Sequence, residues 1–135
     1  MIVAPRNEVE NQLLGKWASE RLGCVFEKYQ TLGVVRGGQL VAVAVYHDYR
    51  EGGIHISFVS TTPRWASRRV LYGILVAYPF GQLKVNRITA VCRKKNKRVR
   101  RLLEGVGFKL EGLHRRGFPD GDACSYGLLK EDYRL

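Results

Sequence analysis

The stretch from Asn96 to Phe108, NKRVRRLLEGVGF, carries the clearest structural signal in this chain of 135 residues. Its apolar residues recur at i, i+3, i+4 and i+7, the spacing of one helical face: Val99, Leu102, Leu103 and Val106. A short β-rich run, Arg87–Cys92, precedes this helix, and another follows it. Strands that alternate with helices predict a parallel crossover within a sheet.

Upstream of that stretch, the pattern predicts a helix over residues 7–22, with Asn7 as its cap and Glu10 three residues on. Its apolar residues at helical spacing are Val9, Leu13, Leu14, Trp17 and Ala18. Three strands follow, over residues 31–36, 40–47 and 54–60, separated by the glycine pairs Gly37-Gly38 and Gly52-Gly53. They predict an antiparallel meander, which a helix over residues 66–80 follows directly.

Two further runs, 108–115 and 124–130, flank Pro119-Asp120-Gly121, a strong turn sequence, and predict a closing hairpin. The complete order is one helix, three strands, a helix, a strand, a helix and two strands. It predicts an α/β (α+β) fold with a mixed, mostly antiparallel twisted sheet and flanking helices. Residues 1–135 contain no long linker or repeat, so we expect a single domain.

Composition limits the classes of protein to consider. With 45% apolar residues the chain can form a core, and no run is long and apolar enough to span a membrane. The start of the chain is too short and polar for a signal peptide, and the three cysteines form an odd set without a metal or redox motif. We therefore expect a cytoplasmic protein with free thiols. The net charge of +11 predicts attraction to polyanions.

The stretch 96–108, together with Glu111-Gly112 and the closing Tyr126–Leu129, resembles the GCN5-related N-acetyltransferase (GNAT) family. The family pattern is N-x-x-A-x-x-L-x-x-x-G-F, and the likeness covers about residues 31–130. It implies the family fold, acetyl-CoA as the cofactor and direct transfer of an acetyl group to an amine acceptor. Pro79-Phe80 and Asp120-Gly121-Asp122 are similar to small members from phage and prophage genomes.

In that family a loop of the form Q/R-x-x-G-x-G/A binds the pyrophosphate, and the aligned residues here are Arg64–Arg69, RWASRR. Arg64 matches the pattern, whereas Ser67 and Arg69 occupy the glycine positions. Backbone N–H groups at a helix start attract phosphate, and arginine adds charge. The resemblance therefore implies phosphate contacts from Arg64, Ser67, Arg68 and Arg69.

The resemblance also implies that the strands 54–60 and 87–92 separate and hold the pantetheine arm between them. Val59 and Thr61 would offer backbone contacts to the arm and the acetyl oxygen, and Asn96 would contact the arm from the next helix. Lys95, Lys97 or Arg98 would contact the 3′-phosphate. No metal is required for this chemistry.

The catalytic residues are less clearly marked. The family often has a glutamate base on the strand before the loop; here His55 stands on that strand, with His47 and His114 as alternatives. The family often uses a tyrosine as the general acid, but Leu103 stands at that position here. Tyr126, Ser60 or water would therefore protonate the departing thiolate.

The acceptor amine is not identified by the sequence, although Glu8, Glu10 and Glu20 could form an acidic rim for it. The alternative function is a catalytically degenerate binding module that uses its basic surface to hold nucleic acid or an acidic protein. Seven of the nine residues 93–101 are basic, but no aromatic residue is interleaved with them, which disfavours single-strand binding. Either a monomer or a homodimer fits the sequence.

Overall fold

A seven-stranded mixed sheet organises the protein in a computed structural model that describes residues 1–135. The strands are β1 (Ile2–Val3), β2 (Tyr29–Arg36), β3 (Gln39–Arg50), β4 (Gly53–Ser60), β5 (Arg87–Arg93), β6 (Lys109–Phe118) and β7 (Gly121–Leu128). They lie in the order β1-β2-β3-β4-β5-β7-β6, and all neighbours are antiparallel except β4 and β5. The predicted mixed sheet and its single parallel crossover are confirmed.

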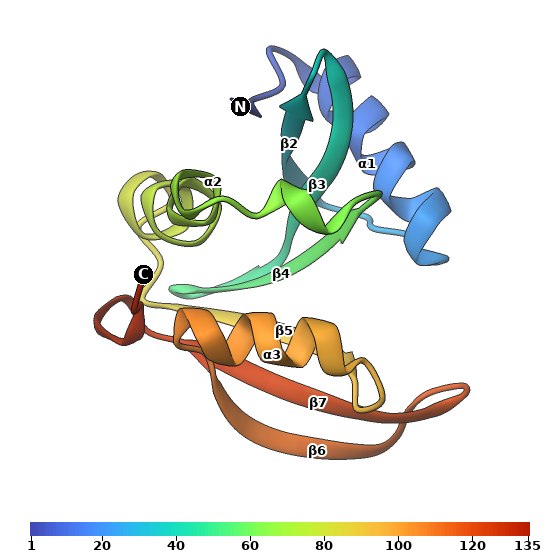
Figure 1. Ribbon diagram of the computed structural model, residues 1–135, viewed down its shortest axis with the longest axis vertical. Helices are drawn as coiled ribbons and strands as arrows, with labels where there is room; N and C mark the ends of the chain where they lie inside the picture. Colours follow the sequence, from blue (N-terminus) through green and yellow to red (C-terminus); the bar gives the residue numbers. More distant parts are fainter.

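Helices cover the sheet on both sides (Figure 1). Helix α1 (Glu8–Leu22) packs on β2 and β3, while α2 (Arg68–Tyr72) and α3 (Lys97–Val106) lie over the core beside β4 and β5. No helix is long and apolar enough to cross a membrane. The larger part of the core lies beneath α2 and α3, and a smaller cluster of Ala18, Val43 and Val45 lies beneath α1.

The buried face of α1 differs from the predicted one. Val9 and Leu13 are 67% and 62% exposed, and the buried residues are instead Asn11, Gly15 and Ala18. A side chain at Gly15 would collide with the ring of Tyr29, so the glycine lets the helix approach the sheet closely. The helix is therefore held by small residues and by polar Asn11, which apolar periodicity does not detect.

Asn11 connects α1 to β2 through two hydrogen bonds. Its side-chain amide donates to the carbonyl of Tyr29 at 3.0 Å and its oxygen accepts from the hydroxyl of Thr31 at 2.7 Å. Both Asn11 and Thr31 are almost fully buried. Each buried polar atom in this pair has a partner, so the hydrogen bonds offset the cost of removing these groups from water. The contact therefore holds the helix on the sheet.

The second predicted helix, 66–80, is observed with different limits and a different geometry. Its α-helical part covers Arg68–Tyr72 and continues as a π-helix, η2 (Gly73–Gln82). Pro79 lies inside η2 and has no N–H to donate, which favours irregular helical hydrogen bonding around it. The apolar spacing of this segment predicts Val70, Leu71, Ile74, Leu75 and Tyr78 on the inward face; the first four are buried and Tyr78 is half-buried against the core.

The remaining elements follow the sequence closely. Gly37 and Gly38 have φ angles of 58° and 77°, as a tight hairpin turn requires. The closing hairpin is present, although its strands extend further toward the Pro119 turn than predicted. The cysteines are free, with Cys92 and Cys124 buried. Strand β1 was missed because two residues contain no periodicity to detect.

Candidate functional site

The divergence of the parallel strands β4 and β5, called the opening below, forms the centre of the candidate site. The two parallel strands pair at only three positions, from Gly53 opposite Arg87 to His55 opposite Thr89. Beyond them β4 stays paired with β3 while β5 stays paired with β7, so the strands diverge (Figure 1). Backbone groups on the two facing edges are then available to an extended ligand that lies between them.

The register shows which backbone groups of β4 face this opening. The N–H of Thr61 donates to the carbonyl of Val41 on β3 at 2.8 Å. Bonds in an antiparallel ladder recur at every second residue, so Val59 also directs its backbone toward β3. Phe58 and Ser60 therefore direct their N–H and C=O groups toward β5. The contacts expected from Val59 and Thr61 are better assigned to these two neighbours.

The loop after β4 leads into the first turn of α2. A short 3-10 helix, η1 (Pro63–Trp65), comes first, and the hydroxyl of Ser67 then caps α2 by accepting from the N–H of Val70 at 3.3 Å. Arg68 and Arg69 are the first helical residues, so their N–H groups have no acceptor within the helix. A local positive potential results.

Four arginines add charge to this loop. Arg64, Arg68 and Arg69 are exposed, and the guanidinium of Arg36 donates to the carbonyl of Arg64. None of the four takes part in any of the ion pairs of the structure. The loop thus presents unneutralised guanidinium groups and free N–H donors together, which is the donor set that a pyrophosphate requires.

The wall beneath the loop is apolar and closely packed. The rings of Phe58 and Trp65 lie 5.4 Å apart, and the space enclosed there between β4, η2 and α3 is only about 10 Å³. Leu103 is 2% exposed and belongs to this wall. It supplies no proton to the site.

His55 lies beside a polar cluster formed by His47 and its two partners on the α1 side of the sheet. His47 on β3 lies opposite His55, with ring centres 5.7 Å apart. The two ring nitrogens of His47 bond to Asp48 and to the hydroxyl of Ser57, each at 2.8 Å. His55 itself stands at the last paired position of β4 and β5, where the opening begins.

Burial is the main cause that lowers the pKa of His55 below its usual value of 6.5, and the neighbouring His47 lowers it further. The hydrogen bond from His47 lowers the pKa of Asp48. His55 is therefore neutral at physiological pH and can accept a proton. Sequence reasoning missed Asp48 and Ser57, although the register of the hairpin around Gly52-Gly53 was a usable signal for the cluster.

A groove of about 760 Å³ borders His47. Its walls mix aromatic, aliphatic and charged residues, and those nearest the histidine cluster are Phe26, Tyr29, Tyr46, His47, Asp48 and Tyr49. Phe26 packs on the His47 ring at 4.9 Å. The groove is large enough for a small molecule and joins the histidine cluster directly.

Tyr126 is not brought to His55. Thr89 is paired with both His55 and Gly127, so the side chain of Tyr126, one residue away, points to the opposite face of the sheet. There its hydroxyl donates to Glu104 at 2.7 Å and accepts from Arg100 at 2.9 Å. The residue is fully buried, and this burial raises the pKa of its hydroxyl.

Three other expected residues lie at the start of α3 or at the end of β4. Asn96 caps α3, because its side-chain oxygen accepts from the N–H of Val99 at 3.2 Å. Its amide group remains as a donor. Arg98 is exposed in the first turn of α3, and Ser60 is half-buried at the end of β4 beside the opening.

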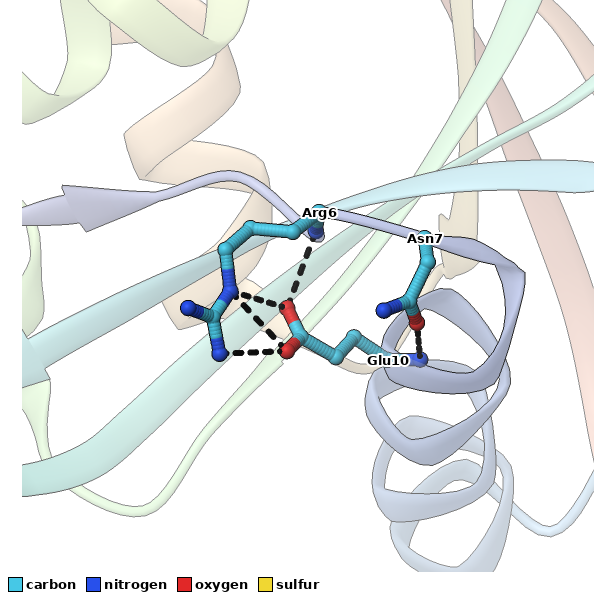
Figure 2. Close-up of polar contacts among 3 residues, drawn as sticks. All are labelled: Arg6, Asn7 and Glu10. Carbon is cyan, nitrogen blue, oxygen red and sulfur yellow. Dashed lines mark hydrogen bonds and ion pairs between the residues drawn. The ribbon is translucent and has the colours of Figure 1, made fainter.

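Of the three glutamates expected to form an acidic rim, Glu10 is paired with Arg6, while Glu8 and Glu20 are exposed and take part in no ion pair. Figure 2 shows Arg6 and Asn7 at the start of α1: Arg6 donates to the Glu10 carboxylate from its guanidinium and its backbone N–H, and Asn7 caps Glu10. The Arg6 charge neutralises Glu10. Its role is to fix the start of α1.

Comparison with family models finds no match, and no curated protein is similar enough in sequence to match. Solved structures do match. An acetyltransferase of the GNAT family from Bacillus anthracis gives a TM-score of 0.62 at 24% identity, covering 75% of this chain and 66% of its own. Mutant forms of the spermidine/spermine N-acetyltransferase SpeG from Vibrio cholerae give 0.74 at 14% identity, covering 98% and 96%.

These matches show that the chain has the GNAT fold, as the sequence resemblance implied. The chain spans just under two thirds of the length of the Bacillus anthracis protein. The narrower likeness to phage and prophage members is not supported by these comparisons.

Proposed function

We propose that this protein is an acetyl-CoA-dependent N-acetyltransferase that moves an acetyl group directly to a primary amine. The observation that carries the proposal is the opening between β4 and β5, which ends at an arginine-rich loop and a helix start. Exposed backbone edges suit the pantetheine amides, and the loop suits the pyrophosphate. Acetyl-CoA would supply the activated thioester.

Each part of the site has a defined role in this proposal. Arg64, Arg68 and Arg69 bind phosphate by charge, and the Ser67 hydroxyl donates a further hydrogen bond while it caps α2. Arg98 or a neighbouring lysine at the start of α3 binds the 3′-phosphate.

The N–H groups of Phe58 and Ser60 hold the pantetheine arm and the acetyl oxygen between the strands, which orients the carbonyl for attack. The free amide of Asn96 contacts the same arm from α3.

His55 acts as the general base in this scheme. Its depressed pKa keeps the ring neutral, so it removes a proton from the incoming ammonium through a water molecule. The amine nitrogen would then attack the acetyl carbon as the carbon–sulfur bond breaks, and the second proton that this nitrogen loses would pass through Ser60 or water to the departing thiolate. Tyr126 is omitted as the acid because its side chain is fully buried and its hydroxyl is already held by Glu104 and Arg100.

The experiment measures the thermal shift with acetyl-CoA in about 0.3 M salt, where weak surface attraction is largely screened. Adenosine 3′,5′-bisphosphate and heparin are the controls for binding of any polyanion. A saturable rise that exceeds both controls supports the cofactor site, and release of free thiol with a panel of amines then tests transfer.

A degenerate binding module is the second candidate. The packed Phe58–Trp65 wall, Arg69 at a glycine position and Leu103 in place of a tyrosine are the observations that favour it. Stabilisation by heparin without any response to acetyl-CoA would reject the transferase and favour this alternative.

A further inference from the structure

A concentrated positive surface lies away from the histidine cluster, where the start of α3 meets the β6–β7 hairpin. We call it the basic face and define it by six exposed cations: Lys94, Lys95, Lys97, Arg101, Arg115 and Arg116. None of them takes part in an ion pair. Their charge is therefore free to act on a partner.

Three adjoining hollows make this face continuous. A hollow of about 510 Å³ is lined by Lys94, Lys95, Lys97, Arg100, Gly121 and Asp122. Asp122 also lines a second hollow of about 730 Å³ beside Arg115 and Arg116. Lys97 and Arg100 are shared with a third of about 310 Å³, which includes Arg101. No residue lining the three hollows is hydrophobic.

The carboxylates near this face are already engaged. Asp122 accepts from the backbone N–H of Arg116 at 2.9 Å, and Asp120 forms an ion pair with Arg93 at 3.0 Å. Glu104 accepts from the hydroxyl of Tyr126. These hydrogen bonds fix the carboxylates of Asp122 and Glu104 in place. The six cations of the basic face still outnumber these two negative charges.

We propose that the basic face binds double-helical nucleic acid through its phosphate backbone. Phosphates spaced along a duplex suit a row of shallow, wholly polar hollows, whereas a compact anion would occupy only one of them. No Phe, Tyr or Trp lines the hollows and His114 is the one ring among the lining residues, so bases have little on which to stack and a single strand is the poorer ligand. The binding is independent of base sequence. This inference does not depend on the proposed acetyltransferase activity.

Fluorescence anisotropy with labelled 20-base-pair duplexes tests the proposal, with separate DNA and RNA arms that distinguish the two forms. If all six cations contact phosphates, the logarithm of affinity for DNA falls with the logarithm of salt with a slope of about −5. The variant K94Q/K95Q/R115Q should bind roughly tenfold more weakly or worse and show a slope closer to −3. Its matched control, K16Q/K84Q/K130Q, loses the same charge from exposed positions elsewhere and should bind as the wild type does.

Three outcomes would overturn the proposal. Equal weakening in both triple variants would show that net charge alone attracts the duplex. Complete displacement of the duplex by saturating acetyl-CoA would assign the whole basic face to the cofactor, whereas a lysine at the start of α3 shared with the 3′-phosphate accounts only for partial competition. Equal or tighter binding of polyglutamate at the same charge concentration would indicate an acidic protein partner instead. Melting curves of all three proteins verify folding. If a variant fails to fold, the salt slope of the wild type still tests how many cations contact phosphate.

Discussion

Replacing Tyr126 with phenylalanine separates a structural role of this residue from a catalytic one. Its side chain is fully buried, and the hydroxyl bonds to two charged groups, Glu104 at 2.7 Å and Arg100 at 2.9 Å. A hydrogen bond to a charged group contributes about 1.5–3 kcal/mol. Glu104 and Arg100 both reach solvent and can bond to water instead. We therefore expect the loss of both hydrogen bonds to lower the free energy of unfolding by about 1.5–3 kcal/mol rather than twice that. The melting temperature should fall by roughly 5–10 °C.

The assay combines urea unfolding with the rate of acetyl transfer. Tyr133 provides the matched control, because its hydroxyl is buried without a hydrogen-bond partner. Tyr133→Phe removes an unsatisfied group, so the free energy of unfolding should stay unchanged or rise. A hundredfold loss of transfer rate in Tyr126→Phe with unchanged stability would refute the reasoning, since the hydroxyl would then have to reach the substrate.

Three further predictions test the site and the fold. His55→Gln should lower kcat/KM by roughly 10²–10⁴, while the control variant His114→Gln, at an exposed histidine, should leave it unchanged. The wild-type rate should be level near neutral pH and fall only below pH 6.5, because the depressed pKa of His55 keeps its ring neutral down to that pH. An acid limb well above pH 6.5 would contradict this assignment. Gly107→Ala should reduce the free energy of unfolding by about 2–4 kcal/mol in urea, since φ is 116° and the new methyl group would collide with the carbonyl of Asp132. Asn7→Ala should cost about 1 kcal/mol in the same measurement through loss of the α1 cap, and an unchanged midpoint would show that the cap is dispensable.

The site was only partly predictable from the sequence. The place of the loop Arg64–Arg69 between a strand and a helix followed from the order of elements, and the separation of β4 from β5 followed from the family resemblance. The partners of His55 did not, since Ser57 and Asp48 meet His47 only through the pairing of β3 with β4. A strand's side chains alternate between faces, so the role of a residue depends on a register that composition does not specify.

The sequence by itself determined the element order, the Gly37-Gly38 turn, the free thiols and the excess of positive charge, because these depend on local backbone preference and on counting. Only the tertiary structure decided which face each element buries. It turned α1 inward on Gly15 and Asn11 instead of on Val9, and it put Tyr126 and His55 on opposite sides of one sheet. Close approach and strand register are properties of pairs of elements, and no single stretch of sequence contains them.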